Sequence, residues 1–148
     1  MSTRLVVTGS RSLTDRALVW AALDAVLDLS AVITWDGEPA GLIHGGAEGV
    51  DRLAALWAGA RGWPTHAIPY ARGKAPGVEP RLWGKRRNQL MLDLARARGG
   101  VVVLAVWDGW SGGTADCIAR ARALDLAVFV ASPANDYTGR PTTKPDTA

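Results

Sequence analysis

Short apolar runs alternate with longer amphipathic stretches along almost the whole chain. We expect strands at residues 5–8, 42–44, 65–69, 101–107 and 127–131, and helices at residues 13–29, 48–60, 84–98 and 114–124. Regular alternation of strands and helices predicts a parallel sheet covered by helices on both faces, which is a three-layer α/β sandwich. With right-handed crossovers, the simplest order for five such strands is 3-2-1-4-5.

The residues after the last predicted strand differ in composition from the rest of the chain. From Ser132 onward the sequence has almost no apolar content, and two prolines lie within its last eight residues. Such a segment cannot bury enough apolar surface to offset the entropy of ordering it. We therefore expect one domain over residues 1–131, a size usual for a single domain, and a disordered tail over residues 132–148.

Several classes of protein are excluded by what the sequence lacks. One cysteine, Cys117, and two histidines, His44 and His66, leave too little material for a disulfide framework or a transition-metal site. No apolar run reaches the roughly 18 residues that a membrane helix needs. The first apolar run ends early at Gly9, unlike the long run of a signal peptide. We expect a cytoplasmic protein with no metal and no cofactor.

The positive charge is concentrated in one segment. The chain carries a formal net charge of +3. Residues 71–87 contain six cations and only one acid, a net charge of +5, so the remainder carries −2. A nucleic-acid-binding protein usually has a broad basic face, whereas one local cluster favours contact with a phosphate group. A solvated basic loop is the alternative. Lys85, Arg86 and Arg87 begin a predicted helix, where the helix dipole disfavours cations.

The strand order predicts where a ligand binds. In the order 3-2-1-4-5 the chain reverses direction between the first and fourth strands, and ligands of such sheets bind outside the carboxyl ends of those strands. The loops there are Gly9-Ser10-Arg11 and residues 108–114. Gly9 permits a tight turn, and Arg11 offers a fork for phosphate, although a plain strand-to-helix turn also explains this motif. Residues 111–114, Ser-Gly-Gly-Thr, supply backbone donors at a helix N-terminus, which suits a phosphate.

Two acids lie near the predicted helix starts. Residues 44–51, His-Gly-Gly-Ala-Glu-Gly-Val-Asp, place two glycines before a helix and Asp51 in its first turn. This is neither a Walker loop nor a full dinucleotide fingerprint. Asp51 either holds a sugar hydroxyl or a neighbouring arginine, or complements the helix dipole. Asp116, expected in the first turn of its helix, acts as a base, grips a ribose or matches the dipole. His44 is more typical of a packed histidine than of a catalyst.

The aromatic residues are mostly tryptophans spread over helices and loops. We expect most of them to serve packing or subunit contacts. Trp110 differs because it lies inside the glycine-rich loop of residues 108–114, where it could stack on a base or cover a pocket. Cys117 is expected to be a small buried residue.

Four motifs in sequence order, VVTGSR, IHGGAEGVD, KRRNQLM and DGWSGGT, resemble the SLOG superfamily of Rossmann-like proteins, and in particular its small YspA-like members. The resemblance covers about residues 4–131. It implies a Rossmann-like domain that binds a nucleoside phosphate or an ADP-ribose-like nucleotide and forms a homodimer or larger homo-oligomer. The binding residues expected on this basis are Gly9, Ser10, Arg11, Gly45, Gly46, Ala47, Asp51, Asn88, Ser111, Gly112, Gly113 and Thr114.

The superfamily also includes the LOG phosphoribohydrolases, which cleave the N-glycosidic bond of a nucleoside monophosphate. Arg87 and Asp116 are similar in placement to the arginine and glutamate of those enzymes, so they are the candidate catalytic residues. The sequence departs from their pattern, because Asp116 is shorter than glutamate, Cys117 replaces a second acid and Asn88 replaces a lysine. Hydrolysis and sensing of the nucleotide therefore both remain open.

Two other classes of function are weighed beside nucleotide binding. The superfamily includes the DNA-processing protein DprA, and IHGGAEGVD is similar to the glycine-rich loop of that family. A DprA-like protein would bind single-stranded nucleic acid through the basic segment and Trp83. A purely structural or partner-binding protein would leave the glycine-rich loops without a ligand.

Overall fold

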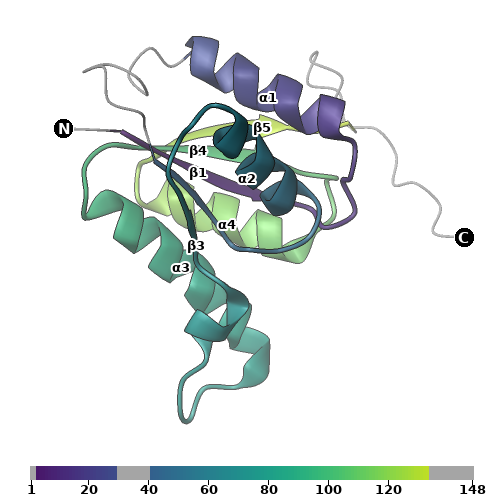
Figure 1. The fold of residues 1–148 in the computed structure, drawn as a ribbon. Coiled ribbons are helices and arrows are strands. Elements are labelled where there is room, and N and C mark those ends of the chain that lie inside the picture. Colours follow the sequence, from purple (N-terminus) through teal and green to yellow (C-terminus); the bar gives the residue numbers. More distant parts are fainter. Residues whose placement is uncertain (1–2, 30–40, 134–148) are drawn as a thin grey trace, which may run out of the picture.

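Five parallel strands form the centre of the protein (Figure 1). The computed structural model describes residues 3–29 and 41–133. The strands are β1 (Arg4–Gly9), β2 (Leu42–His44), β3 (Thr65–Ala67), β4 (Val101–Val106) and β5 (Ala127–Ala131). All neighbours pair in parallel, in the order β3-β2-β1-β4-β5. The predicted fold class and strand order are confirmed.

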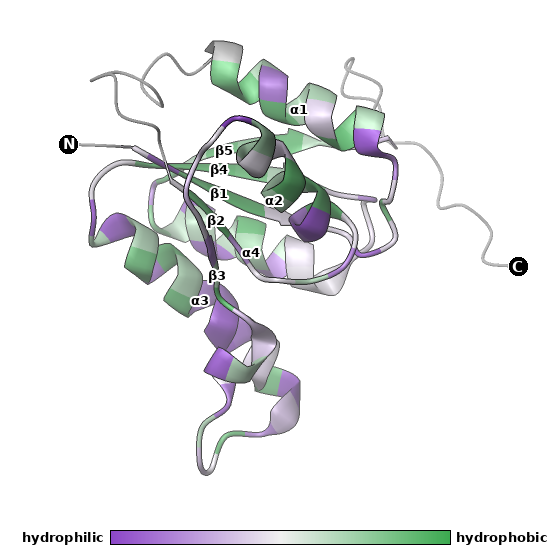
Figure 2. Ribbon diagram, viewed as in Figure 1, coloured by the Kyte–Doolittle hydropathy of each residue, from purple (hydrophilic) through white to green (hydrophobic). Residues whose placement is uncertain are grey.

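Within the described residues, four helices cover the two faces of the sheet. The helices α1 (Arg16–Leu29) and α2 (Val50–Ala60) lie on one face, and α3 (Trp83–Arg96) and α4 (Gly112–Ala123) lie on the other. Successive residues of β1 alternate between the two cores, because side chains alternate across a strand. Leu5 and Val7 pack under α1 and α2, whereas Val6 packs under α3 and α4. The central strands are therefore apolar on both sides, as Figure 2 shows.

The segment between β3 and α3 projects away from the sheet (Figure 1). It contains two short 3₁₀ turns, η2 (Tyr70–Gly73) and η3 (Pro80–Leu82), in the region expected to be a loop. Gly73 packs closely against the start of α3, since a β-carbon there would lie 3.1 Å from the backbone nitrogen of Arg87. The projecting segment is thereby fixed to the helix that carries the basic residues.

The four helices begin one to three residues from the predicted positions, with α2 at Val50 rather than residue 48 and α3 at Trp83 rather than residue 84. Helix α1 begins at Arg16 rather than residue 13, because the Asp15 carboxylate caps it by accepting a hydrogen bond of 3.0 Å from the Ala17 nitrogen. Helix α4 begins at Gly112 rather than residue 114, so its first turn includes both glycines. The expectation that Asp116 lies in the first turn is therefore wrong. Asp116 lies one turn further along the helix.

Three tryptophans serve packing, as expected. Trp57 is only 1% exposed, and Trp20 and Trp63 pack against the same core on the α1 and α2 face. Trp35 and residues 134–148, most of the predicted tail, lie outside the described residues. In the part of the chain that is described, none of the helices has the length and apolar character required to cross a membrane.

Candidate functional site

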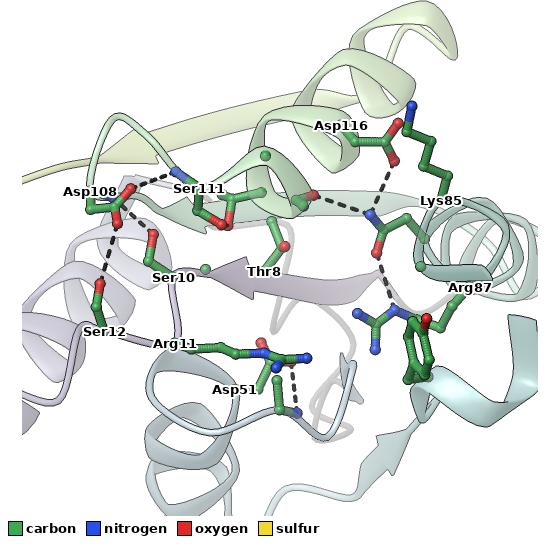
Figure 3. Close-up of a pocket in the computed structure, with 18 of the residues that line it drawn as sticks. Thr8, Ser10, Arg11, Ser12, Asp51, Lys85, Arg87, Asp108, Ser111 and Asp116 are labelled. Atoms are coloured by element: carbon green, nitrogen blue, oxygen red, sulfur yellow. Dashed lines mark hydrogen bonds between the residues drawn. The ribbon is translucent and has the colours of Figure 1, made fainter. Parts of the chain in front are cut away.

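A cavity of about 520 Å³ lies at the carboxyl ends of β1 and β4, where the strand order places a ligand site (Figure 3). Two of the predicted binding residues, Gly45 and Gly46, do not line it. The other predicted binding and catalytic residues do: Gly9, Ser10, Arg11, Ala47, Asp51, Arg87, Asn88, Ser111, Gly112, Gly113, Thr114 and Asp116.

Hydrogen bonds donated to the Asp108 carboxylate organise the turn between β4 and α4. Its Oδ1 accepts bonds of 2.7 Å from the backbone nitrogens of Trp110 and Ser111, and its Oδ2 accepts one of 3.2 Å from the Ser12 hydroxyl. Partial burial acts to raise the pKa of Asp108, but these bonds and the Ser10 hydroxyl lower it overall. The sequence interpretation did not single out Asp108, although an aspartate two residues before a bonded N–H is a usual turn pattern.

The first turn of α4 offers unpaired donors to the cavity. The first backbone N–H groups of a helix have no partner within it and sit at the positive end of its dipole. Ser111 caps the helix without a side-chain hydrogen bond. A β-carbon added at Gly112 or Gly113 would meet nothing within 4 Å. A bound anion can therefore approach this turn closely.

The loop after β2 is held by a buried carboxylate. Asp51 is 4% exposed, and its Oδ2 accepts hydrogen bonds from the backbone nitrogens of Gly45 (3.0 Å) and Ala47 (3.2 Å). Its Oδ1 is buried without a partner among the described residues. Burial raises the pKa of Asp51 to about 6, although the backbone bond from Ala47 and the charge of Arg87 act to lower it. Asp51 therefore supports this loop, a role that the sequence interpretation did not include.

Arg87 holds the other side of Gly45. Its Nη1 donates to the carbonyl oxygens of Gly45 (2.8 Å) and Ile68 (3.3 Å). A β-carbon at Gly45 would lie 2.9 Å from Oδ2 of Asp51 and would also collide with the Arg87 guanidinium. Gly45 is thus required by packing inside the protein. His44 belongs to the same structure, since its Nδ1 accepts a bond of 3.0 Å from the Gly46 nitrogen and burial lowers its pKa.

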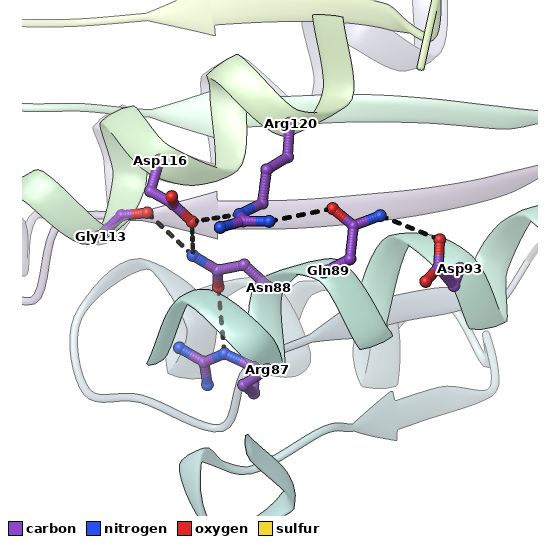
Figure 4. A network of polar contacts seen from close by, with 7 residues as sticks. All are labelled: Arg87, Asn88, Gln89, Asp93, Gly113, Asp116 and Arg120. Carbon is purple, nitrogen blue, oxygen red and sulfur yellow. Dashed lines mark hydrogen bonds and ion pairs between the residues drawn. The ribbon is translucent and has the colours of Figure 1, made fainter. Parts of the chain in front are cut away.

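A chain of polar contacts joins Arg87 to Asp116 (Figure 4). The amide oxygen of Asn88 accepts a bond from Nε of Arg87 (3.1 Å), and its Nδ2 donates to Oδ2 of Asp116 (3.1 Å) and to the carbonyl of Gly113 (3.1 Å). Arg120 adds an ion pair of 2.9 Å to the same Asp116 oxygen. Asn88 therefore bridges the two candidate catalytic residues, and Arg120, which the sequence interpretation missed, neutralises Asp116.

Cations of the projecting segment, of α3 and of the loop after β1 face the cavity. Arg81, Lys85 and Arg87 line it, together with Arg11 from the loop after β1. Figure 3 shows Lys85 and Arg87 on one side, with Ser10, Ser111 and Asp108 on the other. Among the described residues, neither Arg11 nor Lys85 makes an ion pair with an acid. Lining residues that the sequence interpretation did not include in the site are Thr8, Ser12, Tyr70, Arg81, Gly84, Lys85 and Asp108.

Two residues weighed for special roles lie away from the cavity surface. Trp110 is 53% exposed but does not line the cavity. Cys117 is fully buried, as expected, and burial raises the pKa of its thiol to about 11. Within the described ranges, no three His, Cys, Asp or Glu side chains gather in a group able to hold a metal ion.

The fold and the position of the cavity define a Rossmann-like α/β protein. Sequence comparison narrows this class to a family. A model of the YspA, cpYpsA-related SLOG family (YAcAr) matches residues 3–72. The Gene 61 protein of Mycobacterium phage D29 is 32% identical over 135 residues, which cover 85% of this chain and 94% of that protein. The chain belongs to the YspA, cpYpsA-related SLOG family.

A solved structure was also found to be similar. The X-ray structure of DNA processing protein A (DprA) from Streptococcus pneumoniae matches with a TM-score of 0.44 and 15% sequence identity. The match covers 88% of this chain but only 59% of that one.

Proposed function

We propose that the cavity binds a nucleoside phosphate or an ADP-ribose-like nucleotide, with a phosphate group at the first turn of α4. The observation that carries this proposal is the open space beside Gly112 and Gly113. These two glycines line the same cavity as the cations Arg11 and Lys85. Helix N-terminal N–H groups and cations together favour a phosphate. Family membership supports a nucleotide as the class of ligand, and a volume of about 520 Å³ suits a small ligand.

The acids of the cavity do not oppose an anionic ligand strongly. Asp108 is engaged by backbone and hydroxyl donors, and Asp116 is paired with Arg120. Asp51 directs its Oδ2 to the loop after β2. Because the protein already supplies donors to these carboxylates, the exposed cations Arg11 and Lys85 dominate the field that a ligand meets.

Titration calorimetry tests the proposal with a panel of nucleoside 5′-mono- and diphosphates and ADP-ribose. We expect at least one to bind, and Arg11→Ala and Lys85→Ala each to weaken that binding by roughly 10-fold, since a hydrogen bond to a charged group is worth about 1.5–3 kcal/mol. Arg122→Ala is the matched control, because Arg122 is exposed at the far end of α4 and does not line the cavity. Absence of binding across the panel contradicts the proposal.

Cleavage of the N-glycosidic bond is the activity that Arg87 and Asp116 would carry in this proposal. Water would add across the bond between ribose and base, giving free base and ribose 5-phosphate, and a carboxylate near the ribose would stabilise the cationic transition state. Chromatography for free base tests this activity. Asp116→Asn should abolish release, whereas Asp93→Asn, which changes an exposed acid outside the cavity, should preserve it. Binding without free base identifies a sensor instead.

The same preparation tests the remaining predictions about partners. The nucleic-acid alternative is favoured if the protein binds none of the nucleotides but does bind a single-stranded oligonucleotide. The affinity for that oligonucleotide should then fall steeply with added salt. Assembly as a homodimer or larger homo-oligomer is a prediction of the family resemblance. Light scattering of the purified chain measures its mass in solution and so tests that prediction.

A further inference from the structure

Tyr70 is an aromatic side chain in the wall of the cavity. It begins η2, shortly after β3, and 42% of its surface is exposed. Trp110, the residue that the sequence favours for stacking, is also exposed but lies outside the cavity lining. Among the lining residues in ranges 3–29 and 41–133, Tyr70 is the only one with an aromatic side chain.

The tyrosine ring is held in place by its neighbours. Its hydroxyl donates a hydrogen bond of 3.1 Å to the Pro80 carbonyl, and its ring meets Trp83 edge-on, with centroids 6.1 Å apart and an interplanar angle of 61°. Trp83 is itself fixed, because its Nε1 donates to the Val78 carbonyl at 3.0 Å. A ring that is already ordered loses little conformational entropy when a ligand packs against it.

The ring lies on the side of the cavity that the start of α3 forms. A β-carbon at Gly84 would be 3.5 Å from Cε2 of Tyr70, so the ring lies beside the start of α3, next to Lys85. Figure 3 places Lys85 across the cavity from Ser111. The cavity therefore has backbone donors suited to a phosphate at the start of α4 and an aromatic ring beside the start of α3.

We propose that Tyr70 forms the base subsite, against which the nucleobase of the bound nucleotide stacks. This inference rests on the nucleotide binding proposed above and extends it, because it names which part of the ligand the tyrosine side of the cavity selects. A nucleoside monophosphate carries both a phosphate and a flat π-system, whereas a sugar phosphate carries only the phosphate. Every base has a π-face, so a stacking platform distinguishes nucleotides from sugar phosphates more strongly than one base from another.

The test compares one ligand that has a base with one that lacks it. The full chain is titrated with the four ribonucleoside 5′-monophosphates and with ribose 5-phosphate. In the wild-type protein, we expect tighter binding of the monophosphates. Tyr70→Ala should weaken their binding by roughly 10-fold or more, by the usual effect of removing a stacking side chain, and should leave ribose 5-phosphate unchanged.

Tyr70→Phe controls for the fold. It keeps the aromatic ring but removes the hydroxyl that bonds Pro80, and it should bind monophosphates nearly as well as wild type. Equal weakening of both ligand classes by Tyr70→Ala overturns the base subsite, as does no weakening of either. If the wild-type protein binds ribose 5-phosphate as tightly as the monophosphates, phosphate binding stands and the base subsite fails. If no phosphate ligand binds, both proposals fail.

Discussion

Gly9 ends β1 and Gly45 follows β2, whereas Gly112 and Gly113 begin α4 after β4, and the two pairs of glycines differ in the space beside their α-carbons. A β-carbon at Gly9 would lie 2.5 Å from Cβ of Val50 and 2.6 Å from the Val106 carbonyl oxygen, and one at Gly45 would strike Arg87 and Asp51. Beside Gly112 and Gly113 there is no atom within 4 Å. The first pair makes room for the protein itself, and the second pair leaves room that a ligand can use.

This difference separates two reasons for a glycine after a strand. In the first pair, side chains of α2, the Val106 carbonyl and the Arg87 side chain approach the two glycines so closely that a methyl group does not fit. In the second pair, the backbone donors of α4 stay open toward the cavity. The two pairs of glycines look alike in sequence. Substitution at each pair is therefore the direct way to distinguish a glycine required for packing from a glycine that leaves space for a ligand. The four predictions below run from the largest expected effect on folding to the smallest.

Gly9→Ala should destabilise the protein by about 3 kcal/mol or more, because the new methyl group overlaps Val50 and the Val106 carbonyl. Urea unfolding followed by circular dichroism measures the loss. An unchanged unfolding midpoint would show that α2 can retreat from β1 at little cost, and it would remove the distinction between the two pairs of glycines.

Asp108→Ala should cost about 2 kcal/mol, since it leaves the backbone nitrogens of Trp110 and Ser111 without their acceptor. It should also weaken nucleotide binding, because the turn before Gly112 loses its support. Asp108→Asn keeps an acceptor oxygen and serves as the control. Thermal unfolding of both variants measures their stability, and calorimetry measures their affinity for nucleotide. Together they test whether the turn before Gly112 depends on this carboxylate.

The free energy of unfolding should depend on pH through Asp51, the buried carboxyl group that contacts Gly45. Because the folded pKa of about 6 exceeds the usual 3.8, the folded state binds the proton more readily, and stability rises as pH falls through 6 toward 4. Between pH 8 and pH 5 the gain from this group is about 1–2 kcal/mol. The lowered pKa of His44 acts in the opposite sense below its ordinary value of 6.5.

Asp51→Asn isolates the carboxyl from the histidine, since the variant keeps His44 but lacks the titrating acid. As pH falls from 8 to 5, the wild type should gain about 1–2 kcal/mol of unfolding free energy relative to the variant. A difference that is constant with pH would mean that Asp51 titrates near its ordinary pKa.

Gly112→Ala should change the stability by less than about 1 kcal/mol, and in the favourable direction, because alanine replaces glycine in a helix where nothing obstructs the methyl group. Nucleotide affinity should fall severalfold, since the methyl group enters the space beside the phosphate donors. Thermal unfolding and calorimetry provide the two readouts. Intact affinity would show that the phosphate lies elsewhere in the cavity.

The sheet and the position of the cavity followed from local patterns in the sequence. Apolar runs bounded by glycine, such as residues 5–8 and 101–107, marked the strands, and the strand order located the ligand crevice. The role of Gly45 could not be read in the same way, because it depends on Arg87, which lies 42 residues away in the chain. Contacts over such a separation leave no signal in one sequence.

The wall formed by the projecting segment was also beyond the sequence interpretation. Tyr70 and Arg81 lie in a segment whose apolar residues do not recur at a helical or strand spacing. Without such a spacing, the sequence does not indicate which side chains point toward the cavity. The start of α4 was misplaced for a different reason. Glycine is a poor helix former, yet Gly112 and Gly113 form its first turn, where the tertiary structure outweighs local propensity.

The pairing of β1 with β4 has a consequence for synthesis of the protein. Each residue of β1 pairs with a partner 97 positions further along the chain. At about 5–20 residues per second, the ribosome completes β1 roughly 5–20 seconds before β4 exists. During that interval one edge of an apolar strand has no neighbour and can recruit other chains. Because α4 follows β4 in the chain, the turn proposed to bind phosphate is synthesised only after β1 can pair with β4. A nucleotide bound at that turn would therefore stabilise only chains in which this pairing is already possible.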